Sequence, residues 1–164
     1  MSGIVSRPTT RQDLDALVVG GRLWAILDAC DEPGVPKRAR ALGPDRACCL
    51  WEAPRREEDL AVAPFLFHLD ASTLDWLVCD LWAKPWGILA VGQTDLRSLR
   101  RHFRRLLTVH DPDDRPVTFR FYDPRVLAPF LDACTRKEIA EVFGPCQALG
   151  VAASAPGTAL LLLP

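Results

Sequence analysis

The chain has 164 residues and 49% of them are hydrophobic, which is enough to bury one core and excludes intrinsic disorder. Its 20 basic and 21 acidic residues give a net charge of −1, which excludes a global attraction to nucleic acid or anionic lipid. The sequence contains neither a signal-peptide core nor an apolar stretch of membrane-spanning length, so we expect a cytoplasmic protein.

The first part of the chain alternates predicted helices with short apolar runs. Thr10 is expected to cap a helix that extends through Val19. The run 23–27 is continuously apolar, which is typical of a strand covered on both faces. Beyond it, a helix is expected at 36–42 and strands at 47–51 and 65–69.

The middle of the chain contains the clearest helical pattern. Ser72 opens it and forms a variant capping box with Asp75, and Pro85 ends the helix. The run 86–91 is a further apolar strand, which we expect to lie with 23–27 at the centre of a sheet. Another amphipathic helix is expected after Thr94.

The last part begins with alternating apolar and polar residues at 117–122, the period of a half-covered strand. Asp123 is expected to cap a helix that starts at Pro124, and Thr135 with Glu138 forms the capping box of a final helix. This alternation of elements predicts a single compact α/β domain, in which a mixed β-sheet is flanked by helices.

The sequence contains no recognisable pattern for catalysis or metal binding. The histidines are scattered, and the six cysteines include no C-x-x-C pair. No nucleophile elbow and no phosphate-binding loop is present. Asp28 follows a predicted central strand, where α/β proteins tend to place ligand sites, but we interpret it as a loop cap. We therefore expect reduced thiols, no metal, no cofactor and no catalytic residue; an uncharacterised α/β enzyme is the alternative.

The helix expected after Thr94 is rich in arginine. These candidate partner-binding residues are Arg97, Arg100, Arg101, Arg104 and Arg105. They could bind an acidic protein segment, with nucleic acid or another acidic ligand as the alternative. A solvated face is the simpler interpretation, because the net charge is close to zero and few aromatic residues lie among the arginines.

Residues 119–125 read FRFYDPR and join the predicted strand to the next helix without a loop. Asp123 lies between Arg120 and Arg125, so we expect an ion pair to hold this corner. We interpret the stretch as a fold-defining junction.

The stretch 119–126 resembles the signature of a family that was first catalogued as a domain of unknown function and is now identified as type VI secretion effector chaperones, or adaptors. Other segments resemble family motifs in the same order: 22–28 ("LYALLD"), 63–69 ("APYLV.L"), 86–88 ("WGI"), 99–104 ("LRRHLR") and 143–145 ("FGP"). The residues that we take as the signature are Trp24, Asp28, Trp86, Gly87, Phe119, Arg120, Phe121, Tyr122, Asp123, Pro124, Arg125, Phe143, Gly144 and Pro145.

The resemblance implies an effector-chaperone-like α/β domain over 1–146, followed by a short C-terminal tail, 147–164. Proteins of this family bind a toxic effector in the producing cell and help to load it onto the VgrG spike, without catalysis or a cofactor. The implied partners are thus the effector and the spike; a membrane, a nucleic acid or a small molecule is not expected.

Family members often carry a further region after FGP. In this chain the short tail follows FGP instead. We expect the apolar run 160–163 in that tail to cover the domain's own core, with strand pairing to the client as the alternative.

Overall fold

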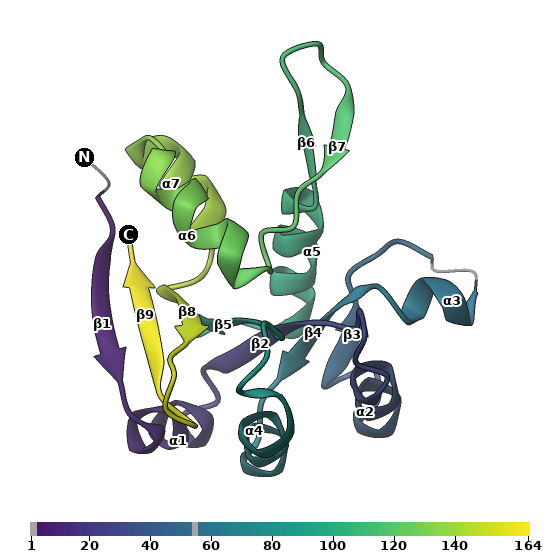
Figure 1. Cartoon of the computed structure of the whole chain (residues 1–164), viewed down its shortest axis with the longest axis vertical. Helices are drawn as coiled ribbons and strands as arrows, with labels where there is room; N and C mark the ends of the chain where they lie inside the picture. The colour runs from purple at the N-terminus through teal and green to yellow at the C-terminus, as the bar shows by residue number, and fades with distance from the viewer. Residues whose placement is uncertain (1–2, 54–55) are drawn as a thin grey trace.

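A seven-stranded antiparallel sheet organises the chain, in the order β1-β9-β8-β5-β2-β4-β3 (Figure 1). The computed structural model describes residues 3–53 and 56–164. The strands of this sheet are β1 (Val5–Thr9), β2 (Leu23–Asp28), β3 (Ala47–Cys49), β4 (Pro64–His68), β5 (Gly87–Val91), β8 (Ala148–Ala152) and β9 (Ala159–Leu163). A separate two-stranded ribbon, β6 (Thr108–His110) and β7 (Pro116–Thr118), stands away from the rest of the molecule (Figure 1).

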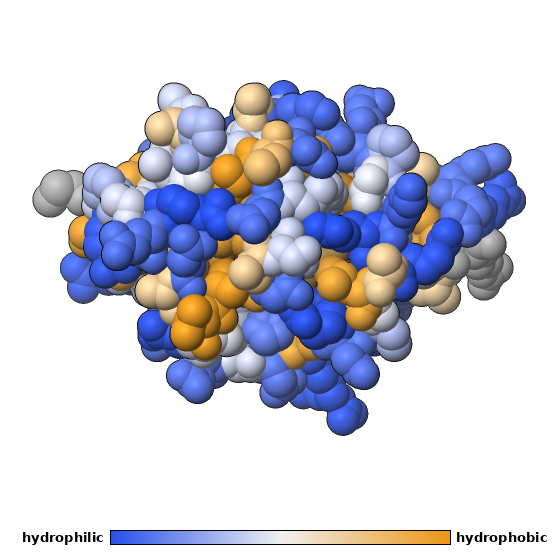
Figure 2. Space-filling model, turned by 90° about the horizontal axis from the view of Figure 1, so that it is seen from below, coloured by the Kyte–Doolittle hydropathy of each residue, from blue (hydrophilic) through white to orange (hydrophobic). Residues whose placement is uncertain are grey.

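Helices cover both faces of the sheet (Figure 1). One face is covered by α1 (Arg11–Val19), α2 (Gly34–Leu42) and α4 (Ala71–Trp76), which continues as a π-helical turn, Leu77–Leu81. The other face carries α5 (Leu96–Leu106), α6 (Pro124–Ala133) and α7 (Arg136–Phe143), while the short α3 (Glu57–Leu60) lies beyond β3. The outer surface of the first layer is mostly hydrophilic, with smaller apolar patches between (Figure 2). No helix in the described ranges has the length and apolar character to cross a membrane.

The strand β2 is buried along its whole length and contributes to both core layers. Ala25 and Leu27 pack in the layer of α1, α2 and α4, whereas Trp24 and Ile26 pack in the layer of α5, α6 and α7. Because β2 pairs with β4 on one side and β5 on the other, it has neither a wet face nor a free edge. The predicted central position of the runs 23–27 and 86–91 is confirmed.

The α/β class is confirmed, but the pairings that the structure describes are antiparallel, whereas a mixed sheet was predicted. The chain does make crossovers through helices, from β2 through α2 to β3 and from β4 through α4 to β5. Each crossover passes over one strand, and that intervening strand runs the opposite way: β4 lies between β2 and β3, and β2 lies between β4 and β5. Strands that point the same way are therefore never hydrogen-bonded neighbours among those described.

The segment predicted as a short C-terminal tail, 147–164, supplies two inner strands to this sheet. β9 lies between β8 and β1, and Leu161 and Leu162 are buried on opposite faces. The run 160–163 thus covers the domain's own core, as expected. The strand β1, which the sequence did not indicate, forms the edge beyond it.

Several predicted boundaries are shifted by one or two residues, including those of α2, β3, β4 and β5, and three further differences have a clear physical cause. α4 is capped by Asp70 and not by Ser72, and α5 is capped by Asp95, one residue after Thr94. In both cases the aspartate side chain accepts a hydrogen bond from a backbone N–H of the first turn. The strand expected over 117–122 ends at Thr118, because its partner β6 is short and the residues that follow turn into the core. The caps at Thr10, Asp123 and Thr135 are as predicted.

Gly87 opens β5 in a conformation that only glycine adopts readily, with φ +147°. A Cβ at this position would lie 1.9 Å from the carbonyl oxygen of Ile26 in the neighbouring strand. The WG pair of the motif therefore reflects how closely β2 and β5 approach.

We expect Gly87→Ala to destabilise the protein by about 3 kcal/mol or more, since it adds backbone strain to a collision with β2. Gly43→Ala is the matched control: its φ is +83°, but a Cβ there meets nothing within 4 Å, so strain alone should cost about 1–2 kcal/mol. Urea unfolding measures the free energy of unfolding of both variants. Failure of Gly87→Ala to fold would also agree with the expectation. Equal losses in the two variants would contradict the steric role of Gly87.

Candidate functional site

The signature stretch meets the end of β2 at a charged corner. The guanidinium of Arg120 donates to Asp28 at 2.5 Å, and the Asp28 side chain is only 12% exposed. Asp28 also accepts from the backbone N–H of Cys30, and its own N–H donates to the carbonyl of Trp86. Two segments that are far apart in sequence are thus joined through one carboxylate, and Asp28 acts as the loop cap that was predicted.

The second half of the corner is formed by Asp123 and Arg125. Asp123 accepts the backbone N–H of Arg125 at 2.9 Å and two bonds from its guanidinium at 2.9 and 2.8 Å. The hydrogen bonds from Arg125 hold the pKa of this carboxyl below its ordinary value. Pro124 occupies the first turn of α6, where its missing N–H costs nothing. The predicted ion pair and helix cap are both present.

The aromatic residues of the signature point into the core. Phe121 is fully buried and stacks on Phe103 of α5, with ring centroids 5.3 Å apart. Phe119 packs against Phe130 of α6 at 4.5 Å. Tyr122 lies edge-on to Phe121 and beneath the Arg120 guanidinium, and burial raises the pKa of its hydroxyl. FRFYDPR therefore fastens α5 and α6 to one another and to β2.

The motifs LRRHFR and FGP contact each other through His102 and Gly144. The Nε2 of His102 donates to the carbonyl of Val142 at 2.9 Å, and burial lowers the pKa of the imidazole. Gly144 has φ +51°, and a Cβ there would lie 2.3 Å from the His102 ring. Phe143 is buried beside them, while Pro145 is exposed. Sequence reasoning missed this contact; the signal was a histidine at an apolar position of an amphipathic helix.

The signature tryptophans are buried on opposite faces of the sheet. Trp24 stacks on His68 at 4.1 Å, and its indole N–H donates to the carbonyl of Gly92. Trp86 packs against Trp82, and its N–H has no partner among the described residues. Most signature residues are thus occupied in holding the domain together, as the fold-defining interpretation expects.

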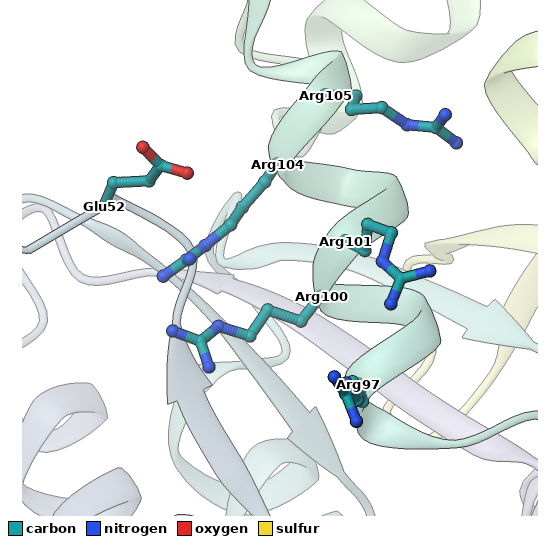
Figure 3. Close-up of a pocket in the computed structure, with 6 residues that line it drawn as sticks. All are labelled: Glu52, Arg97, Arg100, Arg101, Arg104 and Arg105. Carbon is teal, nitrogen blue, oxygen red and sulfur yellow. The ribbon is translucent and has the colours of Figure 1, made fainter.

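The arginines of α5 are mostly exposed and divide into two rows (Figure 3). Arg100 and Arg104 extend towards the chain that follows β3, whereas Arg101 and Arg105 extend to the other side, and Arg97 lies at the start of both rows. Of these, Arg104 is half-buried and the others are exposed.

Arg104 has a structural role within this set. Its guanidinium donates to the carbonyl oxygens of Leu50, Trp51 and Cys49 at 2.9, 3.0 and 3.3 Å. It therefore ties the chain after β3 to α5. Within the described part of the chain, the guanidinium groups of the other arginines of α5 form no ion pair with a carboxylate.

A hollow of about 410 Å³ follows this helix (Figure 3). Its lining consists of Glu52, Arg97, Arg100, Arg101, Arg104 and Arg105. The structure thus brings all the candidate partner-binding arginines to one surface. It has the charge to hold an acidic group and the exposure to admit a large one.

The cysteines are free and dispersed. Adjacent Cys48 and Cys49 face opposite core layers, as their place in a strand predicts. Burial raises the pKa of both thiols and raises the pKa of Cys146 to about 12, so these thiols stay protonated at neutral pH. In residues 3–53 and 56–164, no cluster of three or more potential ligands could hold a metal ion.

Comparison with known proteins gives one match. The model of a family described as a domain of unknown function (DUF4123) matches residues 23–141. This span runs from the start of β2 into α7, so it includes the charged corner and the arginine rows. No curated protein and no solved structure matches the chain.

We expect Asp123→Ala to lower the free energy of unfolding by about 1–2 kcal/mol, mainly through loss of the helix cap. Because the folded-state pKa of Asp123 is depressed, its contribution is present above about pH 4 and is lost as the pH falls through the folded-state value. Urea unfolding at pH 7 and at pH 3 should show a smaller difference between variant and wild type at the lower pH.

The companion variant is Arg125→Ala, which keeps the cap but removes the guanidinium from an Asp123 side chain that is only 8% exposed, so it should also lose about 1–2 kcal/mol at pH 7 and less at pH 3. If Asp123→Ala is as stable as wild type, the corner is not structural and a binding role for it becomes the better interpretation.

Proposed function

The chain belongs to the DUF4123 family of domains of unknown function, and from this membership we propose that it is an adaptor for type VI secretion. In this role it binds a toxic effector in the cytosol of the producing cell and helps to load that effector onto the VgrG spike. It performs no chemistry of its own.

The observation that carries this proposal is the contact between the motifs on which the resemblance rests. Asp28 of the first motif pairs with Arg120 of the fifth, Phe103 stacks on Phe121, and His102 packs on Gly144. Segments matched separately along the sequence therefore form one connected unit. This supports a resemblance of the whole domain and argues against a set of chance matches.

A binding role is further supported by how the charged residues are distributed. Asp28 and Asp123, the buried carboxylates of the signature, are each paired with an arginine. The exposed arginines of α5 are, by contrast, available to a partner. Charge that is unpaired in the free protein and gathered on one surface favours specific and fast association with a protein of opposite charge.

Deletion of the gene in the producing bacterium tests the proposal. We expect delivery of one toxin into neighbouring cells to be lost and to return when the wild-type gene is restored. Other toxins of the same apparatus serve as the internal control and should be delivered normally. The purified chain should also co-elute with the affected toxin in size-exclusion chromatography. Unchanged delivery of every toxin would contradict the proposal.

A further inference from the structure

A second hollow, at the base of the ribbon, borders the hollow along α5. The second hollow has a volume of about 530 Å³ and shares Glu52 and Arg104 with the first. Its other lining residues are Leu50, Trp51, Leu107, Thr108 and Thr118. The two hollows are thus neighbours, and together we call them the α5 groove.

The α5 groove changes in character along its length. At the start of α5 it is lined by arginines, of which Arg97 and Arg100 are exposed and form no ion pair with a described carboxylate. Towards the ribbon its accessible apolar lining is the half-buried Trp51, beside the buried Leu50 and Leu107. A ligand that fills it needs acidic groups at one end and apolar groups at the other.

The ribbon supplies backbone for pairing at the apolar end. β6 and β7 pair only with each other among the described strands, so each keeps an open edge. Thr108 and Thr118, which are cross-strand partners, both line the groove there. An extended polypeptide can add to such an edge through its main chain.

Arg104 fixes the position of the facing wall, the chain after β3, relative to α5. Its guanidinium makes three bonds to carbonyl oxygens of that wall. A preformed site of this kind loses less conformational entropy on binding than one that must assemble.

Resting on the proposed function, we propose that the α5 groove binds an acidic, extended segment of the effector polypeptide. Charge complementarity selects this occupant, since acidic side chains meet Arg97 and Arg100 while apolar ones reach Trp51. A nucleic acid fits less well, because its phosphates repeat along its whole length, whereas among the described residues Arg104 is the one cation that lines the ribbon end of the groove.

An exposed arginine outside the α5 groove provides the matched control. Arg100→Glu places a negative charge in the groove, and Arg136→Glu makes the same charge change at the start of α7, outside the lining of both hollows. Both residues are exposed and unpaired with described carboxylates, so both variants should fold as the wild type does. A difference between them therefore reports position and not net charge.

The probes are a fluorescein-labelled ten-residue peptide that alternates glutamate with valine, and a labelled ten-nucleotide oligothymidylate, each titrated by fluorescence anisotropy over a salt series. We expect the peptide to bind the wild-type chain with an affinity that falls as salt rises. Arg100→Glu should weaken peptide binding by about tenfold, and Arg136→Glu by less than about threefold. Urea unfolding of both variants verifies that they remain folded.

Equal effects of the two variants, or no binding of the peptide, would overturn the α5 groove as the site. Tighter binding of the oligonucleotide than of the peptide would overturn it in favour of a nucleic-acid ligand. The groove and the adaptor role can be contradicted separately. Normal toxin delivery by a strain that carries Arg100→Glu would contradict only the role of the groove. Normal delivery by the deletion strain would contradict the adaptor role.

Discussion

The burial of β2 on both faces and along both edges is the constraint on which the rest of the structure depends. A strand in this position must be apolar throughout, and its polar backbone must be satisfied by its neighbours alone. Close approach of β5 to Ile26 requires the glycine at 87. Where β2 leaves the core, the first side chain that can be polar is Asp28, and burial of that carboxylate requires a cation.

Arg120 supplies this cation, and its position sets the upper layer of helices. The residues that follow it cap and begin α6, while Phe121 packs on α5 and places that helix over the sheet. α5 in turn presents His102 to the turn after α7, where only a glycine leaves room for the imidazole. The signature of the family is thus one chain of contacts from β2 to the end of α7, which explains why these residue types occur together.

A consequence is that the residues most diagnostic of the family are not those best placed to bind a partner. The signature is largely buried and its carboxylates are paired, so its role is to position the surfaces that lie outside it. α5 combines the two roles: its apolar side completes the core, and its arginines form one wall of a groove. Arg104 links these two roles, because it is one of the arginines of the groove and also bonds to the backbone of the opposite wall. Stability of the domain and shape of the groove are therefore coupled at this residue.

The sequence by itself determined what depends on neighbouring residues. The apolar runs of β2 and β5, the caps at Thr10, Asp123 and Thr135, and the ion pair between Asp123 and Arg125 all involve groups a few positions apart, whose geometry the local backbone dictates.

What only the tertiary structure decided involves groups far apart along the chain. Helix–strand alternation cannot reveal that each crossover passes over an antiparallel strand, because strand order is set by long-range pairing. For the same reason β9 could not be recognised as an inner strand until β1 was found beside it. The pairing of Asp28 with Arg120, the contact of His102 with Gly144 and the hollow that Glu52 forms with the arginines of α5 all arise when distant segments pack. Such packing depends on the shape of the whole core, which no short stretch of sequence encodes.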